Sequence, residues 1–276
     1  MKSKIFLGIF KEPVDYIKFS GGEIQISLSE VHRNFLVSKE LEGQINITAH
    51  VKCSEGIILL SQLKNLIDNL NLKEKIVLSL PYVPYARYDR TMLNPDSFSL
   101  QVFANLLNLL NFDEVIVQDC HSEVTTDLIN NCINLSQYQL IKDVFDFSSY
   151  DLIVAPDKGS LFKVARIAKL LNKELIICNK VRDQTTGSLS LSYDILSRTN
   201  IIKGKNVLIL DDICDGGGTF MLAGKELLKY EPNNLGLCIT HGIFSKGVDT
   251  LKEVFDEIYA YNLWEEDLDI QYNIQF

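Results

Sequence analysis

An acidic pair, a third aspartate, three glycines and a threonine occur in this order in the segment LILDDICDGGGTF, which spans residues 208–220. Glycine lets a backbone approach a ligand closely and adopt positive φ, and exposed N–H groups at the start of a helix bind anions. Gly216, Gly217, Gly218 and Thr219 therefore form a candidate phosphate site, to which Thr219 adds a hydroxyl donor. Asp211 and Asp212 would repel a phosphate, but they suit ribose hydroxyls or a hydrated Mg²⁺ that bridges to a diphosphate.

A plain glycine-rich turn, in which Asp211 or Asp215 caps the helix, is the alternative interpretation of the same residues. The order of strand, acidic pair, glycines, threonine and helix favours a functional loop. The segment lacks the Gly-Lys-Ser/Thr ending of a nucleotide-binding P-loop, and its acidic pair precedes the glycines, unlike in the dinucleotide fingerprint. By itself the loop does not say whether a bound sugar phosphate is substrate or product.

The elements that must position this loop alternate between short apolar runs and helical patterns, which predicts an α/β fold with mainly parallel sheets flanked by helices. In such sheets ligands bind at the carboxyl ends of the strands. Strands are expected at 45–51, 75–80, 114–118, 152–155, 174–178, 206–210, 236–240 and 257–261, and helices at 56–70, 98–110, after PDKGS up to 171, and after the glycines up to 229.

The chain has 276 residues, which predicts two domains. The polar, irregular stretch at 134–150 places the boundary, so we expect an N-terminal domain at 1–138 and a C-terminal domain at 139–276.

Composition excludes some partners. A formal net charge of −9 argues against nucleic acid as a bulk electrostatic partner. The six cysteines have no metal-type spacing, which indicates free thiols in a reducing cytoplasm. The N-terminus has no cleavage-site pattern and no stretch is long enough to span a membrane, so we expect a cytoplasmic protein without a membrane partner.

Several further segments occur in one order along the chain: FSGGEI (19–24), PYVPYARYDR (81–90), QDCHS (118–122), APDKGS (155–160), NKVR (179–182) and THGIFS (240–245). Together with the glycine loop, they resemble the motifs of the ribose-phosphate pyrophosphokinase family over nearly the whole chain. The resemblance implies two phosphoribosyltransferase-like domains, Mg²⁺ as cofactor, and transfer of a diphosphate from ATP to ribose 5-phosphate. It also implies a homo-oligomer, a dimer or larger.

The resemblance assigns roles residue by residue. Lys180 and Arg182 would be catalytic, on the family's mobile loop, and His121 and Asp157 would lie at the metal. The implied ATP-binding residues are Phe19, Glu23, Arg87, Asp89, Arg90 and His121. The ribose 5-phosphate would contact Asp211, Asp212, Asp215, Gly216, Gly217, Gly218 and Thr219, and the diphosphate loop would be Asp157, Lys158, Gly159 and Ser160.

Each role has a plainer alternative. Lys180 and Arg182 could be ordinary basic residues at a solvated strand end, and Phe19 could be a core aromatic. Arg87 and Arg90 could form surface ion pairs, and His121 could simply be hydrogen-bonded. His32, His50 and His241 receive no metal role.

The sequence departs from the family pattern at several positions. Gly21 stands where Asp or Asn is usual, Tyr88 replaces Gln, and Gly216 replaces a hydroxyl-bearing Thr. PDKGS lacks a second glycine, and because the sequence stops near the family's last strand, we expect the usual C-terminal helix to be absent. Two other functions share the loop: a phosphoribosyltransferase that consumes PRPP, and a non-catalytic subunit that associates with a synthetase.

Overall fold

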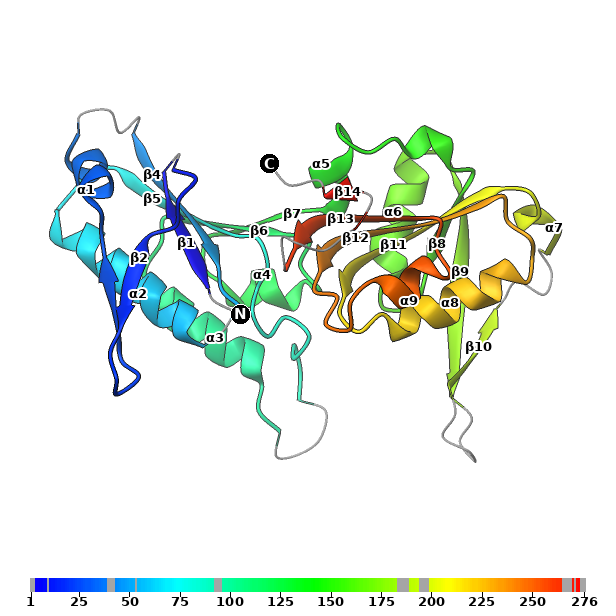
Figure 1. Cartoon of the computed structure of the whole chain (residues 1–276), viewed down its shortest axis with the longest axis horizontal. Helices are drawn as coiled ribbons and strands as arrows, with labels where there is room; N and C mark the ends of the chain where they lie inside the picture. The colour runs from blue at the N-terminus through cyan, green and yellow to red at the C-terminus, as the bar shows by residue number, and fades with distance from the viewer. Residues whose placement is uncertain are drawn as a thin grey trace. The chain divides into compact units, whose positions relative to one another are not determined.

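The computed structural model describes residues 3–8, 10–38, 43–52, 54–91, 96–182, 189–193, 199–264, 270 and 272–273. The chain divides into two compact units, Met1–Ser136 and Gln137–Phe276 (Figure 1). The boundary expected from the sequence, between residues 138 and 139, falls two residues after this division.

The first unit contains a five-stranded sheet of order β1-β4-β5-β6-β7, parallel except for β1, and a separate hairpin. Leu60 and Leu63 of the second helix and Phe103 of the third pack with Ile47 and Leu78 of the sheet in one apolar core. Its elements are β1 (Lys4–Leu7), β2 (Asp15–Lys18), β3 (Ile24–Ser27), α1 (Glu30–Val37), β4 (Gln44–His50), α2 (Glu55–Asn69), β5 (Lys75–Leu80), α3 (Ser99–Asn108), β6 (Glu114–Gln118), α4 (Val124–Leu128) and β7 (Cys132–Leu135).

The second unit contains a seven-stranded sheet of order β10-β9-β8-β11-β12-β13-β14, in which β10 alone pairs antiparallel. Its elements are α5 (Gln137–Ile141), η1 (Phe147–Ser149), β8 (Leu152–Ala155), α6 (Leu161–Leu170), β9 (Glu174–Arg182), β10 (Leu189–Tyr193), α7 (Thr199–Ile202), β11 (Asn206–Cys214), α8 (Gly218–Leu228), β12 (Asn234–Gly242), α9 (Asp249–Lys252), β13 (Glu257–Leu263) and β14 (Tyr272–Asn273).

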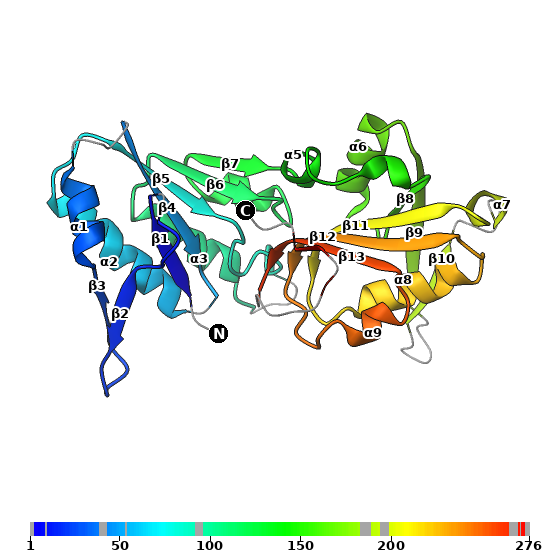
Figure 2. The same ribbon diagram turned by 45° about the horizontal axis from the view of Figure 1, so that its top comes forward.

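Both faces of the second sheet are covered, because successive side chains of β11 enter different cores. Val207 and Ile209 pack with residues of α8 and α9, whereas Leu208 and Leu210 pack with residues of α6. Figure 2 shows α6 on one side of the strands and α8 and α9 on the other. Such a doubly covered parallel sheet explains why its strands are continuous apolar runs.

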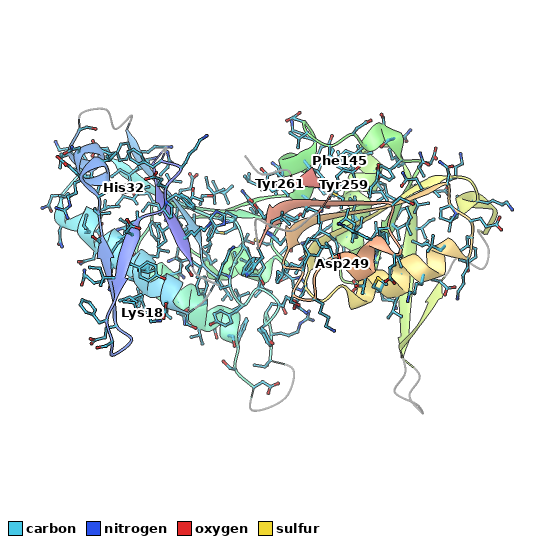
Figure 3. All side chains as sticks on the ribbon, viewed as in Figure 1. Lys18, His32, Phe145, Asp249, Tyr259 and Tyr261 are labelled. Atoms are coloured by element: carbon cyan, nitrogen blue, oxygen red, sulfur yellow. The ribbon has the colours of Figure 1, made fainter. Side chains whose placement is uncertain are left out.

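An aromatic group completes the α6 side of this sheet. The rings of Phe145 and Tyr259 meet edge to face with centroids 4.8 Å apart, and Tyr261 packs against the same core (Figure 3). The Tyr150 hydroxyl donates to the Glu257 carboxylate.

The expected mainly parallel α/β architecture is confirmed. The sequence patterns missed the short or polar strands at the edges, namely β1, β2, β3, β7, β10 and β14. Within the described part of the chain, no helix is long and apolar enough to cross a membrane. Five cysteines are free thiols, as expected, and Cys53 lies outside the described residues.

Candidate functional site

Strand β11 carries the acidic pair. The strand was expected to end at Leu210, but its pairing with β12 continues from Asp211 opposite Ile239 to Cys214 opposite Gly242. The prediction was wrong because backbone hydrogen bonding to a neighbouring parallel strand overrides the polarity of the side chains. Asp211 and Asp212 are therefore held on a sheet rather than on a turn.

Lys163 of α6 reaches this pair. Its Nζ lies 3.3 Å from Oδ2 of Asp212, whose side chain is 7% exposed. The contact follows from strand alternation, since Leu208 and Leu210 face α6 and Asp212 is the next residue on that side. No sequence motif includes Lys163, although the alternation along β11 is a signal that could have found it.

Asp211 is half-buried beside two other carboxylates. Its Oδ1 accepts a hydrogen bond from the backbone N–H of Asp212 at 2.9 Å. Burial, followed by the neighbouring Asp212 and with a smaller contribution from Asp157, raises the pKa of Asp211 well above its usual range. Crowded, desolvated carboxylates of this kind favour a bound cation or hydroxyl donors.

Gln137, the first residue of α5, also fixes the backbone at this point. Its buried side-chain amide donates to the carbonyl oxygen of Asp211 at 2.8 Å and lies 3.4 Å from that of Cys238. One amide thus bridges the neighbouring strands β11 and β12 beside the acidic pair. No motif pointed to Gln137.

The glycine turn after β11 has the conformation expected of a phosphate loop. Gly217 precedes α8 with φ of +74°, and a Cβ there would lie 3.2 Å from Leu251. Residues of the THGIFS motif hold the turn in place, because Ile243 N–H and Phe244 N–H both donate to the Cys214 carbonyl. The predicted turn is confirmed, and its ligand-binding role stays a prediction.

We predict that Gly217→Ala lowers the free energy of unfolding by about 1–2 kcal/mol, because an L-residue is strained at positive φ. Gly218→Ala is the matched control, since a Cβ there would meet nothing within 4 Å. Urea unfolding of both variants measures the difference. Equal stability of the two would contradict the left-handed conformation at Gly217.

The PDKGS segment lies between β8 and α6, with Asp157 capping its own turn. Oδ1 of Asp157 accepts from Gly159 N–H at 2.8 Å and Ser160 N–H at 3.2 Å. These are two of the N–H groups that were predicted to bind a diphosphate, so such a ligand has to replace the carboxylate there. Lys158 is exposed beside them.

In the first unit, the ARYDR and QDCHS segments follow β5 and β6, which are adjacent strands. Asp89 is buried, and its Oδ1 lies 3.0 Å from Nε of Arg90. Burial alone would raise the pKa of Asp89, but Ser122, Arg90 and, more weakly, His121 lower it below its usual value. The sheet thus brings Asp89, Arg90 and His121 together, and Arg87, Arg90 and His121 are all exposed.

The same two loops contain left-handed residues that the sequence did not reveal. Tyr85 has φ of +63° and Asp119 has φ of +42°. Strained backbone of this kind clusters at ligand-binding sites, and here both residues lie just beyond strand ends.

FSGGEI forms the tip of the β2–β3 hairpin. Phe19 N–H donates to the Glu23 carbonyl, and the turn between them contains Gly21 and Gly22. Phe19 is 51% exposed, so the alternative of a core aromatic is wrong. Lys18, labelled in Figure 3, forms an ion pair with Glu55 of α2 and ties the hairpin to the unit.

Lys180 and Arg182 lie within β9 and not after it, which corrects the expected strand end at Cys178. In the antiparallel pairing with β10, Lys180 is opposite Leu191 and Arg182 is opposite Leu189. The polar run was interpreted as a loop because it continues the strand only through antiparallel pairing with β10, and such pairing leaves no pattern within the run itself.

Carboxylate oxygens are the donors available to a divalent ion in the second unit. Asp157, Asp211 and Asp212 fit the chemistry of Mg²⁺, which binds through one or two carboxylates, substrate phosphates and water. In the described part of the chain, no group of three or more His, Cys, Asp or Glu side chains is arranged to hold a metal alone. The predicted ligands His121 and Asp157 belong to different units.

Other histidines differ in setting. His241 is buried, and its Nδ1 lies 3.3 Å from the side-chain nitrogen of Asn262. His32 is buried against Phe10 and beside Ser29.

Comparison with known proteins covers both halves of the chain. Residues 128–273 match the phosphoribosyl transferase domain family. A ribose-phosphate pyrophosphokinase of Pyrococcus furiosus is 32% identical over 68% of this chain and 66% of its own length, just under two thirds. One of Methanobrevibacter smithii is 30% identical over 85% of this chain and 79% of its own.

The fold has a counterpart among solved structures. The phosphoribosylpyrophosphate synthetase from Mycobacterium smegmatis has a TM-score of 0.71 and covers 90% of this chain and 80% of its own, at 20% identity. Fold, motif order and sequence identity therefore agree: the chain belongs to the ribose-phosphate pyrophosphokinase family.

Proposed function

We propose that the protein is a ribose-phosphate diphosphokinase. In this reaction the 1-hydroxyl oxygen of ribose 5-phosphate attacks the β-phosphorus of ATP and loses its proton. The bond between the α,β-bridging oxygen and that phosphorus breaks, which gives PRPP and AMP. The observation that supports this most is the acidic pair on β11 followed by the left-handed glycine turn at the start of α8.

The residues of the second unit suit ribose 5-phosphate. Asp211 and Asp212 would accept hydrogen bonds from ribose hydroxyls, and the N–H groups at Gly216–Thr219 would hold the 5-phosphate. Asp215 would help to fix the turn, since its carboxylate accepts from the Ser245 hydroxyl at 2.6 Å.

The first unit would bind ATP. Arg87 and Arg90 suit its phosphates, because guanidinium groups bind phosphate in a bidentate manner. The exposed ring of Phe19 can stack on a base, with Glu23 beside it. Lys180 and Arg182 would stabilise the charge that spreads over the diphosphate during transfer.

Mg²⁺ is part of the proposal. When bound, it would neutralise phosphate charge during transfer. In this chain Asp157 and the acidic pair have the donor chemistry to hold it, with His121 as the predicted ligand on the ATP side. A cytoplasmic homo-oligomer also remains our expectation.

An assay for AMP tests the function. The purified protein is mixed with MgATP and ribose 5-phosphate, and AMP is followed with Lys180→Ala as the control. No AMP above that control would refute the proposal. Release of diphosphate from PRPP and a nucleobase without ATP would indicate a phosphoribosyltransferase, and activity only with a second synthetase would indicate a regulatory subunit.

The unusual Gly216 gives a second, quantitative prediction. The three atoms nearest to a Cβ at this position would all belong to Lys246, at 3.5 Å or more, so a Cβ fits there without a clash. We expect Gly216→Thr to bind ribose 5-phosphate about two- to tenfold more tightly, because a hydroxyl donor is restored. Calorimetric titration measures this, and Gly216→Val, which adds similar bulk without a hydroxyl, is the control. Equal affinities of the Thr and Val variants would exclude a hydroxyl contact.

A further inference from the structure

A lysine that no motif includes lies beside the glycine turn. The Cδ and Cε atoms of Lys246 are 3.6 and 3.5 Å from where a Cβ of Gly216 would be. One C–N bond further along, the ammonium group must lie close to the turn. The Lys246 side chain therefore runs past Gly216 at ordinary van der Waals distance from the position that a Cβ would take.

The segment that contains Lys246 is hydrogen-bonded to the turn. Ser245 N–H donates to the Asp215 carbonyl at 3.1 Å, and the Ser245 hydroxyl donates to the Asp215 carboxylate at 2.6 Å. On its other side, Gly247 has φ of +73°, and its N–H donates to the Phe244 carbonyl at 2.8 Å. The backbone that carries Lys246 is thus positioned by the same turn that is proposed to bind phosphate.

The positive charge of Lys246 contrasts with the carboxylates at the turn. Asp211, Asp212 and Asp215 place three carboxylates at or next to it, and the nearby Lys163 is paired with Asp212. Lys246 is exposed and forms no ion pair with any residue that the structure describes. A phosphate dianion at the turn would otherwise meet mainly negative side chains, so an available ammonium group favours its binding.

We propose that Lys246 binds the 5-phosphate of the sugar and supplies the contact that a hydroxyl at position 216 would otherwise make. The ligand class is a phosphomonoester dianion. This inference rests on the proposed function, because it concerns the same site. It adds a residue outside the family-like motifs and explains how the turn works with glycine at position 216.

The test is the affinity for ribose 5-phosphate, measured by calorimetry, with inorganic phosphate as a competing probe. We expect Lys246→Ala and Lys246→Met to weaken both ligands about tenfold, and Lys246→Arg to stay within about threefold of the wild type. Methionine keeps an unbranched side chain over Gly216 but carries no charge. Weaker binding by Lys246→Met would therefore show that the charge, and not the packing, makes the contact. Lys225→Ala, at an exposed position of α8, is the matched control and should bind like the wild type.

A double variant sharpens the result. If the ammonium group and a hydroxyl at 216 serve the same phosphate, Lys246→Ala should weaken binding less in a Gly216→Thr background than in the wild type. Full affinity in Lys246→Met, or the same loss in both backgrounds, would overturn the inference.

The outcome is separable from that of the proposed function. A wild type that binds ribose 5-phosphate without forming AMP refutes only the reaction, and the Lys246 comparison still decides the phosphate contact. A wild type that binds no ribose 5-phosphate and no phosphate refutes both.

Discussion

Replacing Lys180 or Arg182 by alanine is expected to lower kcat by roughly 10²–10³-fold, because each would remove a cation that stabilises charge in the transition state. The affinity for ribose 5-phosphate should change by less than about threefold, since an interaction made only in the transition state does not contribute to substrate binding. Initial rates of AMP formation and calorimetric binding measure the two quantities separately.

Lys169→Ala is the control for this pair of substitutions. Lys169 is an exposed lysine in the last turn of α6, away from the acidic pair, and should keep both kcat and affinity. An equal loss of kcat and of affinity in the Lys180 and Arg182 variants would contradict a transition-state role. Full activity in both variants would favour the alternative that Lys180 and Arg182 are ordinary basic residues of the strand.

Asp211→Asn is expected to stabilise the protein while abolishing its binding of ribose 5-phosphate. The pKa of Asp211 is raised, so the folded state prefers its neutral form. Its contribution to stability is fully present below the ordinary pKa of an aspartate and is lost as pH rises through the raised value. At pH 8 the uncharged carboxamide of the variant should therefore raise Tm. The expected rise is about 2–4 °C for each kcal/mol gained in the free energy of unfolding, in a domain of this size.

Urea unfolding of Asp211→Asn and wild type from pH 4 to pH 9 measures this effect. The difference in free energy of unfolding should be small at pH 4 and should grow with pH. Adding Mg²⁺ at pH 8 should stabilise the wild type more than the variant, because a cation relieves the repulsion among the carboxylates. A variant that is less stable than the wild type at every pH would contradict the assignment of charge repulsion to this site.

Local patterns in the sequence predicted the central strands of both sheets and the glycine turn. These elements depend on apolar runs and on glycine, which act over a few residues. The extension of β11 through Asp211 and Asp212, by contrast, depends on pairing with β12, and such pairing is not encoded in the strand itself. The same holds for β9 and the position of Lys180.

Residues that reach the site from elsewhere were harder to foresee. Lys163 lies 49 positions before Asp212, and Lys246 lies 30 positions after Gly216. Alternation along β11 indicates which face Asp212 takes, but the choice of Lys163 as its partner comes from helix packing, and the position of Lys246 comes from hydrogen bonds between loops. The exposure of Phe19 likewise follows from its place at a hairpin tip, which the sequence did not indicate.

The bridge made by Gln137 has a practical consequence for any attempt to separate the two halves of the chain. The residue that opens the second unit is also the one whose amide spans the carbonyls of Asp211 and Cys238. A fragment beginning at residue 139 would lack this amide and its hydrogen bonds to both carbonyls, whereas one beginning before Ser136 would retain them. Where such a protein is cut thus decides whether the edge that carries the acidic pair keeps its hydrogen bonds.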